Sequence, residues 1–230
     1  MHVNYTYSKY MQATELLNQA DLRPTEVISD QDFRHRVAIS SIYELPFGRG
    51  RPLLSGAHPL VNGIVGGWQI GGTYTLQSGA PITFANNPSN LQFGQVSNPT
   101  GVIFNGSFSD IPLPSDQRSV YRWFNTSGFV TNAAQQLDLG RQIRTFPLRL
   151  GNVRGDMGNQ FDLSALKNTR IGERLNVQFK GEFLNAFNHP VFPLPTGNAV
   201  NPANINFAGV TVTNQANYPR RIQLTIKLLF

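Results

Sequence analysis

The side chains that most often carry catalysis or bind metals are few in this sequence and stand far apart. Its four His residues are His2, His35, His58 and His189. No two of them have a metal-ligand spacing such as H-x-x-x-H, and there is no Cys to hold zinc, form a disulfide or act as a thiol nucleophile. The sequence has no G-x-S-x-G elbow and no glycine-rich loop between a strand and a helix. We therefore expect no catalytic residue, metal site or cofactor, and no enzyme.

Charge and hydropathy argue against two further classes of protein, those that bind nucleic acids and those with transmembrane helices. Charged residues make up 14% of the 230 residues and the net charge is +6, but Lys and Arg never form a run of five. A nucleic-acid-binding surface is therefore not expected. The sequence has no apolar stretch of the length that a transmembrane helix needs, and its first residues do not have the pattern of a signal peptide. The mixture of 16 Phe, 21 Gly and 15 Pro instead suggests many half-buried strands joined by many turns.

Strict alternation of apolar and polar residues is the main structural signal. At the end of the chain one face carries Ile222, Leu224, Ile226, Leu228 and Phe230, and the other face carries Arg221, Gln223, Thr225 and Lys227. Successive side chains of a strand point to opposite faces, so this pattern predicts a strand with one apolar and one polar side. The same pattern recurs along the chain and predicts six strands, at 3–11, 35–45, 67–77, 160–167, 175–187 and 220–230.

We predict an all-β fold in which these strands form an antiparallel up-and-down meander, curved and open, with exposed edges at the first and last strands. Each strand has roughly the length that crosses a bilayer at a tilt. Between them, the segment 78–159 is rich in Asn, Ser, Gly and Pro and is interpreted as a large loop. Long loops on one side and short turns on the other are typical of outer-membrane barrels.

Aromatic residues near the strand ends favour a membrane-embedded sheet, because such residues gather at both lipid interfaces. They are Tyr5, Tyr7, Tyr43, Trp68, Tyr74, Phe161 and Phe187. Strand edges that are not paired cannot face lipid, and the smallest closed bacterial barrels have about eight strands. We therefore expect an incomplete portion of a barrel whose other strands lie upstream.

Several segments, in order, carry a family resemblance. HRVAISSIYELPFGRGRPLL, GGWQIGGTYTLQSGAPITF, WFNTSGFV, LGNVRGDMGNQFDLSALKNTRIGERLNVQFKGEFLNAFNHPVF and PRRIQLTIKLLF resemble the barrel of Oar-like TonB-dependent receptors, over about residues 33–230. The resemblance implies that 1–230 is the C-terminal part of an outer-membrane barrel, without the signal peptide, regulatory-like β-sandwich and plug of full-length members. It also implies passage of a bulky, unknown ligand through a lumen and energisation by a TonB-type partner.

The polar faces supply the candidate residues. Residues expected to face the lumen are Arg36, Glu44, Gln69, Gln178, Lys180, Glu182, Gln223 and Lys227. Phe230, on the apolar face, is the expected signal for the barrel-assembly machinery, as the resemblance implies. Both chain ends lie in the periplasm in this barrel class, so we expect loops 12–34, 78–159 and 188–219 outside, and turns 46–66 and 168–174 in the periplasm.

One alternative comes from the same residues. Exposed aromatic residues and Asn/Ser-rich loops are also compatible with a secreted or surface β-sandwich that binds glycans or protein partners. That fold predicts two packed sheets, with both faces of the strand that begins at Leu175 buried.

Overall fold

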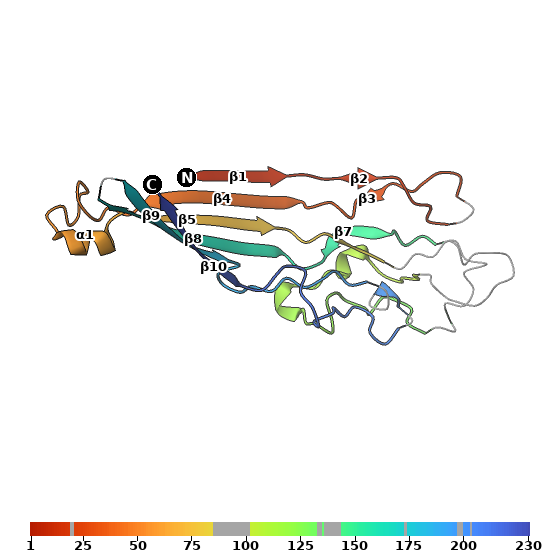
Figure 1. Ribbon diagram of the computed structural model, residues 1–230. Helices are drawn as coiled ribbons and strands as arrows, with labels where there is room; N and C mark the ends of the chain where they lie inside the picture. The colour runs from red at the N-terminus through yellow and green to blue at the C-terminus, as the bar shows by residue number, and fades with distance from the viewer. Residues whose placement is uncertain are drawn as a thin grey trace.

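A six-stranded antiparallel sheet is the main element of the computed structural model, which describes residues 1–18, 21–84, 102–132, 135, 144–172, 174–196, 200–202 and 204–230 (Figure 1). Its strands are β1 (His2–Tyr7), β4 (His35–Glu44), β5 (Trp68–Gln77), β8 (Gly158–Ile171), β9 (Leu175–Leu184) and β10 (Arg221–Leu229). They lie in the order β1-β4-β5-β8-β9-β10, and each pairs antiparallel with the next. The predicted all-β up-and-down meander is confirmed.

Strand boundaries differ from the prediction where local backbone geometry intervenes. The first strand ends at Tyr7, and the chain then continues as a small hairpin of β2 (Met11–Gln12) and β3 (Val27–Ile28) within the predicted loop 12–34. β8 extends to Ile171, so the predicted turn 168–174 is shorter and begins at Gly172, whose φ of 65° suits glycine. β9 ends before Asn185, whose φ of 49° breaks the extended backbone.

The sheet is open. Among the described residues, β1 pairs only with β4 and β10 only with β9, so each leaves one edge unpaired. A sheet whose apolar face meets lipid must close on itself, and six strands are fewer than the about eight of the smallest barrels. The sheet is therefore an incomplete portion of a barrel.

The β-sandwich alternative does not fit this structure. It requires a second sheet packed against the apolar face, yet the apolar side chains of β10 are exposed, with Leu224 at 66% and Ile226 at 69% of full exposure. Of β9, only Gly181 is buried. No second sheet covers these strands within the described part of the chain.

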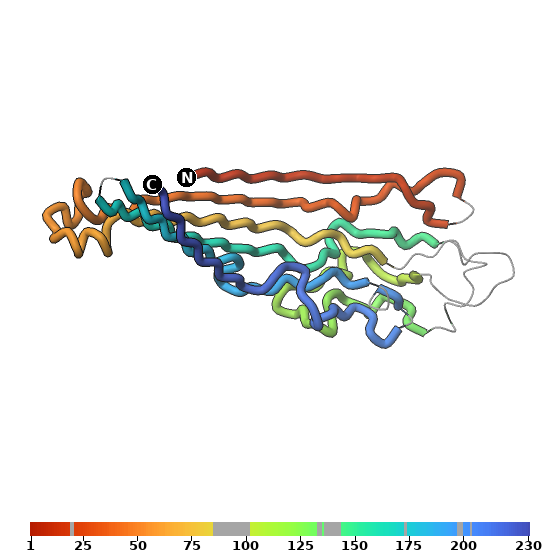
Figure 2. Tube along the Cα trace, viewed as in Figure 1, coloured from red at the N-terminus to blue at the C-terminus, as the bar shows by residue number. Residues whose placement is uncertain are grey.

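The two ends of the strands differ in what connects them. Both chain termini lie towards the end that carries the short helix α1 (Pro59–Val65), in the connection between β4 and β5 (Figure 1). The tight turn between β8 and β9 is at this end too. The trace in Figure 2 shows the long connections gathered at the opposite end of the strands. The expected asymmetry between short and long connections is thus present in part, because the β8–β9 turn is short but the β4–β5 connection at the same end, residues 45–67, is long.

The hydrophobic core of the chain lies in these long connections and not against the sheet. These connections hold the small pair β6 (Pro81–Thr83) and β7 (Arg149–Arg154) and the 3-10 turns η2 (Phe108–Asp110) and η3 (Ser115–Gln117). The buried cluster consists of Ile82, Phe84, Val102, Ile111, Phe124, Phe129, Phe146, Leu150, Val153, Val200, Phe207 and Ala208. We call this region the loop core.

The loop core alters the interpretation of 78–159 as a large loop. The parts of that segment that the structure describes hold packed aromatic rings, such as Phe84 at 4.9 Å from Phe146 and 5.4 Å from Phe124 between ring centroids. Residues 85–101 and most of 133–143 of the predicted loop lie outside the described residues.

Candidate functional site

The register of the sheet sorts its side chains into two continuous faces. Residues directly opposite each other in an antiparallel pair project to the same side. Ile226 lies opposite Phe179, Leu224 opposite Gly181, and Gly181 opposite Ala165, so apolar residues meet apolar or small ones from strand to strand. The alternation in each strand is thus in phase with its neighbours, and the sheet has one apolar and one polar face.

All the residues expected to face the lumen share the polar face. Arg36 lies opposite Gln77, and Glu44 opposite Gln69, on β4 and β5. Towards the other edge of the sheet, on the same face, the opposed pairs are Gln178 with Lys227, Lys180 with Thr225, and Glu182 with Gln223. The two groups are joined through β8, where Leu166 lies opposite both Gln69 and Lys180.

Ion pairs and amide contacts hold several of these side chains. Lys180 Nζ lies 2.8 Å from Glu182 Oε1 on the same strand. Gln178 Nε2 donates a 2.9 Å hydrogen bond to Asn168 Oδ1. Glu44 pairs with Arg51, which belongs to the connection that also carries α1. All these groups are at least partly exposed, so each pair contributes at most about 1 kcal/mol.

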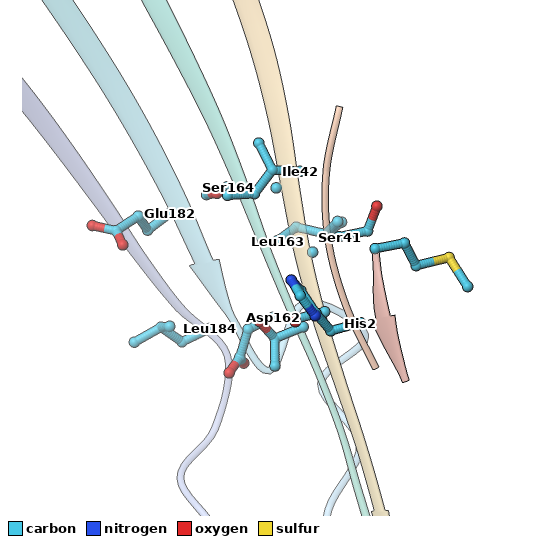
Figure 3. Close-up of a pocket in the computed structure, with 13 residues that line it drawn as sticks. His2, Ser41, Ile42, Asp162, Leu163, Ser164, Glu182 and Leu184 are labelled. Atoms are coloured by element: carbon cyan, nitrogen blue, oxygen red, sulfur yellow. The ribbon is translucent and has the colours of Figure 1, made fainter. Parts of the chain in front are cut away.

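A shallow hollow of about 490 Å³ opens on the polar face near the middle of the sheet (Figure 3). Its lining includes His2, Asp162, Ser164 and Glu182, from β1, β8 and β9. Small residues make the space: a Cβ at Gly71 would lie only 2.5 Å from Ser164 Oγ. Of the expected residues, only Glu182 lines the hollow, and sequence reasoning missed Asp162 because it stands alone in its strand.

A hydrogen-bond network fixes the loop-side rim of the hollow. Gln160 Nε2 donates to both carboxylate oxygens of Asp162, at 3.1 and 3.0 Å, and also lies 3.0 Å from the Tyr218 hydroxyl. The backbone N–H of Asn185 donates to Asp162 Oδ1 at 2.8 Å. The buried Asn185 amide then donates to the carbonyls of His189 and Tyr218. Both ends of the β9–β10 connection are thus bound to the polar face.

Charged groups join the loop core to the connection between β1 and β4. Arg154 pairs with the fully buried carboxylate of Asp32, and its Nη1 donates to the carbonyls of Asp32 at 2.6 Å and Gly79 at 3.0 Å. Arg149 Nη2 lies 2.9 Å from Glu15 Oε1. These contacts join segments 12–34 and 78–157, which the sequence presents only as separate loops.

Two groups of this region have a lowered pKa, for different reasons. Burial by itself raises the pKa of Asp32, but hydrogen bonds from Arg154 and the Tyr10 N–H, together with the charges of Arg154 and Arg34, outweigh it and hold the pKa below 3.8. Burial lowers the pKa of Arg144 to about 10. Both groups remain charged at neutral pH, so the ion pair between Asp32 and Arg154 is intact there.

Aromatic side chains form two rows across the apolar face. Tyr5 and Tyr7 pack around His35 at the loop end, where the Tyr5 hydroxyl lies 2.9 Å from His35 Nδ1. Tyr43 and Trp68 lie near the end that carries α1. Along the strands, the level of Tyr7 and His35 is eight residues from Tyr43 and ten from the level of Trp68, roughly 26–33 Å at ~3.3 Å per residue. At a tilt of ~40° this gives roughly 20–25 Å, close to the ~25 Å height of the apolar band of an outer-membrane barrel.

Other chemistry is not assembled in the part of the chain that the structure describes. No group of three or more His, Asp or Glu side chains could hold a metal ion among the described residues. His58 instead caps α1, its Nδ1 accepting from the Leu60 N–H at 3.4 Å. Among the described helices, none is long and apolar enough to span a membrane.

Comparison with known proteins gives one match. A family model described as an outer membrane beta barrel domain matches residues 1–223. No curated protein and no solved structure matches the chain. The match covers all of the sheet except the last residues of β10.

Proposed function

The chain belongs to the outer membrane beta barrel domain family and lies in the outer membrane, and from this we propose that it forms part of the wall of a TonB-dependent, Oar-like transport barrel. The polar face of the sheet lines a lumen, and a bulky nutrient passes along it. The chain contacts outer-membrane lipid with its apolar face. On this proposal the chain performs no chemistry of its own.

The observation that carries the proposal is the matched register of the polar face over all six strands. A row of Gln, Lys, Glu and Arg side chains on a face opposite to lipid needs water, and a wide lumen supplies it. Lys180 and Glu182 present both signs of charge on this face, only one strand from the unpaired edge of β10. Such a mixed surface suits transient contacts with a polar ligand better than tight binding.

The loop core supports a ligand-binding role at the loop end of the barrel. Its aromatic rings and buried ion pairs hold the connections between strands in one arrangement, and binding residues are often placed on loops that a rigid scaffold supports. We place this end outside the cell and the end with α1 in the periplasm. A TonB-type partner and a plug would then act from the periplasmic side, and the ligand would enter from the loop side.

Cysteine labelling tests the lumen directly, because the chain has no Cys of its own. Single-Cys variants Lys180→Cys and Phe179→Cys, neighbours on opposite faces of β9, are produced from the native gene and treated with a membrane-impermeant maleimide on intact cells. We expect labelling of Lys180→Cys and little labelling of Phe179→Cys. Labelling at 179 with protection at 180 would reverse the assignment of the faces.

The same variants test energisation. If a TonB-type partner opens the lumen, collapse of the proton-motive force should slow labelling of Lys180→Cys and leave Phe179→Cys unchanged. An equal labelling rate in energised and de-energised cells would contradict TonB dependence while leaving the barrel wall intact.

A further inference from the structure

Two side chains of the apolar face hold the C-terminal end of α1. Trp68 Nε1 donates to the Ile64 carbonyl at 2.9 Å, and Lys167 Nζ donates to the carbonyls of Ile64 at 2.9 Å and Gly66 at 2.7 Å. Trp68 and Lys167 lie opposite each other in the β5–β8 pair, and Lys167 Nζ is 5.1 Å from the Trp68 ring centroid. The end of the helix is therefore fixed to the apolar side of the sheet and not to the polar side.

The outer surface of α1 is apolar and exposed. Leu60 has 74% and Ile64 70% of full exposure, one turn apart on the helix, and Val61 adds a third apolar side chain. The polar residue of the helix, Asn62, turns inward, where its Oδ1 accepts from the Arg49 N–H at 2.6 Å. A helix of seven residues is marginal by itself, so these contacts, the His58 cap and Pro59 at its start maintain it.

The surroundings of α1 indicate what covers this surface. The helix continues the apolar face of the sheet at the row of Trp68, the residue type that marks a membrane interface. Lys167 carries a cation on the apolar face and directs it towards this end, as Lys does near a lipid interface. Arg49 and Arg174 are exposed in the connections at the same end of the strands, and their cations suit phosphate groups.

We propose that α1 is an interfacial foot, which inserts Leu60 and Ile64 among the acyl chains of anionic phospholipids at the α1 end of the barrel. The neighbouring Arg side chains contact the phosphates of the same lipids. Trp68 and Lys167 set the depth of the foot relative to the sheet. This inference rests on the placement of the apolar face in the outer membrane and is independent of what the barrel transports.

Spin labelling of the whole chain tests the proposal. Ile64→Cys is compared with Leu224→Cys on the apolar sheet face and with Ser55→Cys, an exposed polar position of the same connection. Each variant carries a nitroxide and is reconstituted in vesicles of phosphatidylethanolamine and phosphatidylglycerol. Access to oxygen, which concentrates in lipid, is measured against access to a water-soluble nickel chelate. We expect the oxygen-to-nickel ratio at 64 to be several times that at 55 and close to that at 224.

The outcomes separate this inference from the proposed function. If the label at 64 behaves like the label at 55 while the oxygen-to-nickel ratio at 224 is that of a lipid-exposed site, the interfacial foot is refuted. The proposal that the sheet is part of a barrel wall is then unaffected. If the label at 64 is shielded from both reagents, another part of the chain or a second copy of it covers α1, and the lipid assignment is refuted. If the oxygen-to-nickel ratio at 224 is that of a water-exposed site, the placement of the apolar face in the membrane is refuted, and this inference is refuted with it.

A variant of the holding contact adds a second test. Lys167→Met keeps an apolar stem on the face but removes the donor to the two helix carbonyls. We expect the label at 64 to become more mobile and its oxygen-to-nickel ratio to fall, with no change at 224. An unchanged ratio and mobility at 64 would refute the role of Lys167 in setting the depth of the foot.

Discussion

Replacing Arg154 with Met removes the cation that joins the loop core to segment 12–34, and we expect the loop region to lose about 3 kcal/mol of stability at neutral pH. Met has a similar length and keeps most of the apolar packing. The carboxylate of Asp32, which is 0% exposed, then stays buried without its cation. The loss therefore measures a buried charge that has lost its partner.

The magnitude follows from the contacts that are removed. Arg154 pairs with the Asp32 carboxylate and also donates to the carbonyls of Asp32, Gly79 and Gly151. Removing one partner of a buried ion pair costs about 3–5 kcal/mol. We expect the lower end because Asp32 Oδ1 still accepts from the Tyr10 N–H at 2.7 Å.

The pH dependence gives the prediction its sign. In the native chain the folded-state pKa of Asp32 lies below 3.8, so its stabilising contribution is complete above that pH and is lost as the pH falls through the lower folded value. In the Arg154→Met variant, burial still raises the pKa of Asp32 while the hydrogen bond and the charge of Arg154 no longer lower it, so we expect the pKa to rise relative to the native chain. Acid then neutralises the unpaired carboxylate, so the deficit of the variant should shrink as the pH is lowered towards about 4.

The fluorescence of Trp123 reports unfolding of this region, since its Nε1 donates to the Arg154 carbonyl at 2.8 Å. Urea unfolding of the detergent-solubilised chain is followed by Trp fluorescence in a Trp68→Phe background, which leaves one of the two Trp residues. Arg122→Met, an exposed Arg beside Trp123, is the matched control and should change stability by at most about 0.5 kcal/mol. A deficit below about 1 kcal/mol for Arg154→Met, or one that does not change between neutral and acid pH, would refute the reasoning.

Three further predictions test the loop core, the two faces and the chain end. Phe84→Ala should destabilise the loop core by about 3–5 kcal/mol, seen as an earlier unfolding of the Trp123 signal; a shift near zero would mean that the rings are not packed as described. Leu224→Arg, on the apolar face, should cost about 2–4 kcal/mol and lower the amount of protein in the outer membrane, whereas Gln223→Arg should be tolerated. Equal levels would contradict the assignment of the faces. Deleting Phe230 should strongly reduce the assembled protein if it is an assembly signal; normal levels would leave it only an anchor worth about 1.5–3 kcal/mol.

The six strands and their two faces could be predicted from the sequence, because period-two alternation is a local property. Each strand shows its apolar side without reference to its partner, as the row Ile222, Leu224, Ile226, Leu228 demonstrates. The polar positions of β4, β5, β9 and β10 fall on one face for the same reason. Slips of one residue are thereby excluded, since they would exchange the faces, but the exact pairing of residues is given only by the tertiary structure.

The loop core could not be predicted, because its contacts are non-local and have no period. Phe84 meets Phe124 and Phe146, and Phe129 meets Phe207, across long stretches of chain. The only signal was compositional, in the 16 Phe of the sequence. Irregular spacing in a segment rich in Asn, Ser, Gly and Pro is typical of a loop, and only the tertiary structure shows that these rings share one core.

The ion pair between Arg154 and Asp32 and the helix α1 could not be predicted from the sequence either, because their contacts are also non-local. Arg154 and Asp32 are 122 residues apart, and nothing in either segment marks the other as its partner. α1 is too short to be predicted from an apolar stripe, and it is held by Trp68 and Lys167 from two different strands. Alternation in the sequence thus determines the wall of the barrel, whereas folding in three dimensions determines what is attached to its two ends, because those attachments depend on side chains that only the sheet brings together.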